Sequence, residues 1–97
     1  MTSRSAIEKK LAENTADLAK AREEVRVLDE QIAHFADSAD DARLRAMVSE
    51  TPLAEREHRE ASRTVTALQK DRLSWSHRIE RLEQAQDDLL DRLSELR

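Results

Sequence analysis

The chain has 97 residues, of which 38% are hydrophobic and 39% are charged, and it contains no glycine and no cysteine. Its length allows a single domain, and the lack of cysteine excludes a disulfide framework and thiolate chemistry. The net charge of −4 and the pI near 5.4 argue against a nucleic-acid-binding surface, because such surfaces are usually basic.

The first half of the chain predicts one long helix over about residues 5–49. Apolar residues recur there in alternating steps of four and three, which is the heptad spacing of helices that pack along a narrow seam. Ser5 and Glu8 have the spacing of a capping box, so Ser5 is the predicted N-cap. The seam positions are Ile7, Leu11, Asn14, Leu18, Ala21, Val25, Leu28, Ile32, Phe35, Ala39, Ala42, Ala46 and Ser49.

The segment 37–41 is the place where this helix could bend. Asp37 and Ser38 are good N-cap residues, so a kink at 37–41 is the alternative to a straight passage. We favour a continuous helix, because the heptad repeat passes through the segment as Ala39 and Ala42.

The only proline, Pro52, marks a turn at about residues 50–51 and the start of a second helix over about residues 52–96. Thr51 is the predicted N-cap, with proline at the first helical position, where its missing N–H costs nothing. The second seam reads Ala54, His58, Ala61, Val65, Leu68, Arg72, Trp75, Ile79, Leu82, Gln86, Leu89, Leu93 and Leu96.

These two helices predict an all-α fold, an antiparallel two-helix coiled-coil hairpin that forms one domain over residues 1–97. Seam residues equally far from the turn should face each other, which places Asn14 opposite Gln86. An amide pair in a seam can set the register, because a slip would strand both groups against apolar neighbours. Arg72 falls opposite Leu28 and is expected to extend its guanidinium to the rim.

A single hairpin buries only one seam, so dimerisation into a four-helix bundle is a further possibility that the sequence leaves open. Apolar residues outside the seam could form a second, thinner apolar face for such a homodimer. They include Val27, Leu73 and Leu90.

Four apolar residues outside the seam gather near the turn: Leu44, Met47, Val48 and Leu53. Such a cluster suggests a surface that contacts a partner. The alternative is that the four side chains wrap the end of the hairpin and cover its alanine-rich seam. An acidic cluster, Asp37, Asp40 and Asp41, precedes them, and a solvated helix face is the simpler interpretation of these acids.

Catalytic and metal-binding chemistry is not expected, and no cofactor is predicted. Glu55 and His58 have the Glu-x-x-His spacing of di-iron bundles, but the facing helix offers alanines instead of further carboxylates. A hairpin also has no pocket in which to desolvate a nucleophile, so we expect no enzyme. The stretch 53–81 is locally basic, yet interleaved acids such as Glu55, four residues before Arg59, favour an ion-paired face over nucleic-acid binding.

An antiparallel hairpin with acids near its end resembles the N-terminal arm of Gre-type transcription factors, which insert an acidic tip into the secondary channel of RNA polymerase. Here the cluster lies before the turn and not at it. The resemblance implies one alternative function, a transcription-machinery effector that presents Asp37, Asp40 and Asp41 to RNA polymerase.

The favoured interpretation is a non-enzymatic coiled-coil adaptor or regulatory protein that binds a larger protein partner through the hairpin tip. A self-associating structural bundle is the second alternative. The cytoplasm is the expected location, with no membrane association, because the sequence shows neither a signal-peptide core nor an apolar run of about 18 residues.

Overall fold

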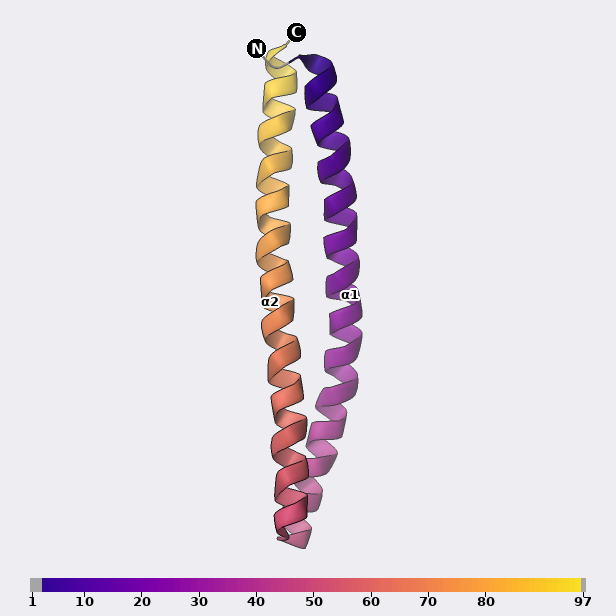
Figure 1. The fold of residues 1–97 in the computed structure, drawn as a ribbon, viewed down its shortest axis with the longest axis vertical. Helices are drawn as coiled ribbons and strands as arrows, with labels where there is room; N and C mark the ends of the chain where they lie inside the picture. The colour runs from indigo at the N-terminus through magenta and orange to yellow at the C-terminus, as the bar shows by residue number, and fades with distance from the viewer. Residues whose placement is uncertain (1–2, 97) are drawn as a thin grey trace. The chain divides into compact units, whose positions relative to one another are not determined.

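The computed structural model describes residues 3–96. Helix α1 comprises Arg4–Ser49 and helix α2 comprises Pro52–Glu95, and there is no strand among the described residues. The two helices pack against each other in opposite directions (Figure 1). The predicted all-α hairpin is therefore confirmed. Its local cause is a chain rich in good helix formers, such as alanine, leucine, glutamate and arginine, with no glycine to interrupt them.

The hairpin divides into two compact units, each containing a part of both helices. The turn unit is residues 26–73, with the last turns of α1, the connection and the first turns of α2. The end unit is the described residues 3–25 and 74–96, where the first turns of α1 pair with the last turns of α2.

The core of the end unit lies along the predicted seam. Ile7 and Leu18 are each 2% exposed and Ala21 is fully buried. The facing seam residues of α2 from Trp75 to Leu93 are half-buried. Leu96 was also predicted as a seam residue of the second helix, but it lies beyond the end of α2 and is 43% exposed. Large side chains therefore form most of the apolar contact in this unit.

The core of the turn unit is built mainly from small side chains. Leu28 is buried at its start, and Ala42, Ala46 and Ala54 are buried near the turn. Buried alanines remove little apolar area from water, and the stabilisation scales with that area at about 25 cal/mol per Å². Phe35, although it occupies a seam position, is 38% exposed and lies edge-on against His34.

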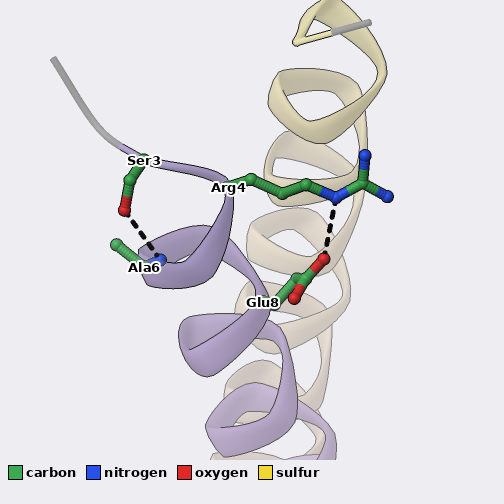
Figure 2. Close-up of polar contacts among 4 residues, drawn as sticks. All are labelled: Ser3, Arg4, Ala6 and Glu8. Atoms are coloured by element: carbon green, nitrogen blue, oxygen red, sulfur yellow. Dashed lines mark hydrogen bonds and ion pairs between the residues drawn. The ribbon is translucent and has the colours of Figure 1, made fainter.

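The start of α1 differs from the sequence prediction. Ser3 is the N-cap, because its Oγ accepts a hydrogen bond from the backbone N–H of Ala6 at 3.2 Å (Figure 2). The predicted capping box of Ser5 and Glu8 is wrong. Because α1 begins at Arg4, Ser5 already lies inside the helix and is not its N-cap. Glu8 instead accepts a hydrogen bond from Arg4 Nε at 2.9 Å.

α1 has no break at residues 37–41. Ser38, which could have capped a new helix, instead donates its hydroxyl to the carbonyl of His34 at 3.3 Å. This bond to the preceding turn uses the side chain within the helix, so a cap at this position is not formed.

The connection between the helices is two residues long. Glu50 adopts a left-handed conformation with φ of 51°, and its N–H donates to the carbonyl of Ala46 at 3.1 Å. Thr51 Oγ1 then accepts from the N–H of Ala54 at 3.2 Å, and Pro52 is the first residue of α2. The predicted Thr51 cap and the proline at the first position are confirmed.

Candidate protein-binding face near the turn

The four apolar residues near the turn are at the surface. Leu44 is 53% exposed, Met47 65%, Val48 85% and Leu53 61%. At these exposures they do not cover the alanine-lined seam, which was the alternative to a contact surface.

Helical periodicity explains why these side chains face outward. Leu44, Met47 and Val48 are spaced three and four residues apart, so they share one face of α1. The buried seam residues Ala42 and Ala46 define the opposite face, because a heptad places the two sets on opposite sides of the helix. We call the outward surface of α1 over residues 37–48 the α1 outer face.

The acidic cluster belongs to this same face. Asp37, Asp40 and Asp41 precede Leu44 at the heptad-equivalent positions, and all three are exposed. None of the three forms an ion pair with any described residue. The α1 outer face thus consists of an acidic half followed by an apolar half, which ends at the turn.

The corresponding outward surface of α2 has the opposite charge. At the same heptad positions α2 presents Leu53, Arg56, Arg59 and Arg63, all exposed. One acid, Glu60, lies among them. Within the described part of the chain these arginines form no ion pair, so the expected pairing of Glu55 with Arg59 is not found. We call this surface, over residues 53–63, the α2 outer face.

Met47 has one further contact on the α1 outer face. Its Sδ lies 3.9 Å from Nη1 of Arg43, one turn earlier, which is a weak charge–sulfur interaction. The thioether chain can change shape at low cost, and methionine is for this reason common on surfaces that adapt to partners.

The two residues expected to set the register lie in the end unit. Asn14 is 8% exposed and its Nδ2 donates to the backbone carbonyl of Leu82 at 3.0 Å, while Gln86 is half-buried. In an α-helix the carbonyl of residue 82 also accepts from the N–H of residue 86. The Asn14 amide therefore binds the main chain of α2 one turn before Gln86, and the two side-chain amides form no hydrogen bond with each other among the described residues.

An ion pair across the seam of the turn unit was not predicted. Arg72 reaches the rim, where its Nε donates to Oδ1 of Asp29 at 2.5 Å and its Nη2 lies 3.4 Å from Oδ2. This bidentate hydrogen bonding lowers the pKa of Asp29 below its ordinary value and raises that of Arg72. The signal was present in the sequence, because Asp29 flanks the seam position that faces Arg72.

Among the described residues, Glu55 and His58 are not joined by further metal ligands. Glu55 is exposed and His58 half-buried, and no group of three or more histidine, aspartate or glutamate residues within 3–96 is placed to hold a metal ion. Two surface depressions lie in the end unit. Their lining residues are Arg4, Leu90, Leu93 and Ser94 for one, and Lys10, Ala85, Asp88, Leu89 and Arg92 for the other.

No protein-family model, curated protein or solved structure matches this chain. Within the described residues neither helix has an apolar stretch long enough to cross a bilayer.

Proposed function

We propose that this protein is a non-enzymatic helical-hairpin adaptor or regulator that binds a larger protein through the α1 outer face and Leu53. The observation that carries the proposal is the exposure of Leu44, Met47 and Val48 on one helix face that points away from the hairpin seam. The cytoplasm is the proposed compartment, which fits a chain without cysteine.

The energetic argument concerns the apolar half of this face. Burying one exposed leucine or methionine completely is worth about 1.5–3 kcal/mol. Residues spaced as Leu44, Met47 and Val48 are the anchors by which a helix binds a groove on another protein. The adjacent acids are better suited to orienting a partner than to strengthening the complex, because exposed ion pairs contribute about 0–1 kcal/mol each.

Site-specific photo-crosslinking in cells tests the proposal. A photoreactive residue at position 47 should give a discrete crosslinked species, whereas the same residue at position 73 should not. Leu73 is a suitable control because it is also an exposed leucine, at 56%, and lies outside the proposed surface. The partner is then identified from the crosslinked band.

A matched pair of variants tests the same surface by affinity. Leu44→Asp with Met47→Asp should weaken binding of the crosslinked partner by at least about tenfold, since about 1.4 kcal/mol corresponds to a factor of ten. Leu73→Asp with Leu90→Asp removes two leucines of similar exposure and should leave binding unchanged. Equal binding by both variants, each shown to be helical by circular dichroism, would rule out the α1 outer face as the contact surface.

A further inference from the structure

The turn unit has outward surfaces of opposite charge on its two helices. The α1 outer face presents Asp37, Asp40 and Asp41, and the α2 outer face presents Arg56, Arg59 and Arg63. None of these six side chains has an ion-pair partner within the described residues. The aspartates of the α1 outer face therefore have no cationic partner, and the arginines of the α2 outer face have no anionic partner. The charges of the two faces are complementary.

The two faces also match residue by residue. Because the connection is at 50–51, residues equally far from it lie at the same level of the hairpin. Asp37 lies at the level of Arg63, and Asp40 at about the level of Arg59. The apolar halves correspond as well, since Val48 lies at about the level of Leu53.

We infer that a second copy of this chain docks side by side with the first, its α2 outer face covering the α1 outer face, with both turns pointing the same way. The contacting helices are then antiparallel. In such antiparallel packing, a residue in the centre of one helix face meets a central residue of the other face. A residue at one edge of the face meets the residue at the equivalent heptad position of the other helix.

This arrangement pairs Asp37 with Arg63 in the centre of the contact and Asp40 with Arg59 at one edge. Val48 meets Leu53 at the other edge, beside the turn. Leu44 falls under the aliphatic stem of Arg56, which can cover an apolar side chain while its guanidinium stays in water.

One pair opposes the others, because Asp41 falls at about the level of Glu60 on the second edge. Three arginines against three aspartates leave the attraction dominant in spite of this pair. The alternative of a symmetric contact between two α1 outer faces would place acid against acid, and one between two α2 outer faces would place arginine against arginine.

A contact between two different faces leaves one α1 outer face and one α2 outer face unpaired at the ends of every assembly. Such contacts extend into open assemblies or close into rings. We expect association that depends on protein concentration and weakens at high salt, since exposed charges are screened over about 8 Å at physiological ionic strength.

Charge exchange between the two faces provides the test, with sedimentation velocity as the measurement. Asp37→Arg with Asp40→Arg makes both faces basic, and Arg59→Asp with Arg63→Asp makes both acidic. Each variant alone should need at least about tenfold more protein than the wild type to associate, because about 1.4 kcal/mol corresponds to a factor of ten.

An equimolar mixture of the two variants should associate again, because each then offers the face that the other lacks. The four substitutions combined in one chain should likewise restore association. Asp87→Arg with Asp91→Arg is the matched control, since it changes the net charge as much as the first variant at exposed positions of the end unit. This control should associate as the wild type does.

Three results would each overturn the inference. The first is a wild-type protein that remains an 11.2 kDa monomer at millimolar concentration and low salt. The second is association that neither charge variant changes. The third is association that is lost in the variants and that the mixture and the fourfold variant both fail to restore. The inference uses the tip residues of the proposed function but does not depend on a foreign partner. Crosslinking at position 47 to this same chain alone would support a second copy and end the adaptor proposal.

Discussion

Asn14 is the one polar side chain among the described residues that falls in the buried class, and its hydrogen bond ends on a carbonyl that already serves α2. Removing the amide leaves that carbonyl with its helical partner, so no buried acceptor is left unsatisfied. Removal of the Asn14 amide therefore costs one hydrogen bond and a small side-chain volume.

Asn14→Ala should lower the free energy of unfolding by about 1–2 kcal/mol. Urea unfolding followed by circular dichroism measures the change. Thr15→Ala, at the next, exposed position, is the control and should change stability by less than about 0.5 kcal/mol. Equal effects of the two substitutions would show that the amide contributes nothing.

The Asp29–Arg72 pair gives the turn unit a pH dependence. Hydrogen bonding to Arg72 is the main reason that the pKa of Asp29 is lowered in the folded state. A lowered carboxylate pKa stabilises the fold above the unfolded pKa, about 4, and this stabilisation is lost as pH falls through the folded value. Arg72 stays charged throughout this range.

A double-mutant cycle with Asp29→Asn and Arg72→Gln should therefore show favourable coupling at pH 7 that is smaller at pH 3, below the unfolded pKa of the carboxyl. Asp17→Asn removes another exposed carboxylate of α1 and serves as a control for general acid effects. Coupling of the same size at both pH values would assign the interaction to packing and not to charge.

At the scale of the elements, the connection contains a residue in an unfavourable conformation. Glu50 occupies the left-handed region that glycine adopts at helix C-termini. A residue with a Cβ atom pays about 1–2 kcal/mol there. Glycine avoids this cost but gains freedom in the unfolded chain, which offsets part of the benefit.

Glu50→Gly should consequently raise the free energy of unfolding by about 0.5–1 kcal/mol. Glu55→Gly, inside the first turns of α2, should instead lower it by about 1 kcal/mol. Thermal and urea unfolding of the two variants provide the comparison. A loss of stability in Glu50→Gly would mean that the glutamate side chain itself supports the turn.

The two units should differ in local stability. The end unit buries Ile7 and Leu18, whereas alanines make up most of the buried core of the turn unit. Amide hydrogens from about residue 37 to 61 should therefore exchange faster than those of 11–28 and 79–93.

Hydrogen exchange read by mass spectrometry or NMR measures this difference directly. Dilution to a concentration below self-association is the necessary control, because a second copy on the outer faces would protect the same stretch. Stronger protection around the turn than in the end unit, at high dilution, would contradict the expectation.

For the molecule as a whole, the heptad repeat was enough to predict two helices, their direction and most of their seam, although the predicted seam residues Phe35, Ser49 and Leu96 are exposed. It was also enough to place the α1 outer face, because the positions opposite a seam follow from the same repeat. The N-cap was missed because Ser3 and Ser5 are equally good caps, and spacing to Glu8 favoured the wrong one. The left-handed Glu50 had no sequence signal, since neither glycine nor asparagine stands at that position.

The hairpin topology also has a consequence for the rate of folding. Asn14 and Leu82 are separated by 68 residues, whereas Ala46 and Ala54 flank the two-residue connection. Closing the longer loop costs about 2 kcal/mol more entropy than closing the shorter one. Helix pairing should therefore start at the turn and proceed toward the chain ends.

Ala46→Gly should accordingly slow folding, while Leu18→Ala should mainly speed unfolding. Chevron plots of both variants, at protein concentrations that keep the chain monomeric, give the two φ-values. A φ-value for Leu18 above that for Ala46 would place the nucleus at the chain ends.

If the turn forms first, the segment that starts folding is also the one that opens most easily afterwards. Kinetic lifetime then depends on the large side chains at the far end of the helices.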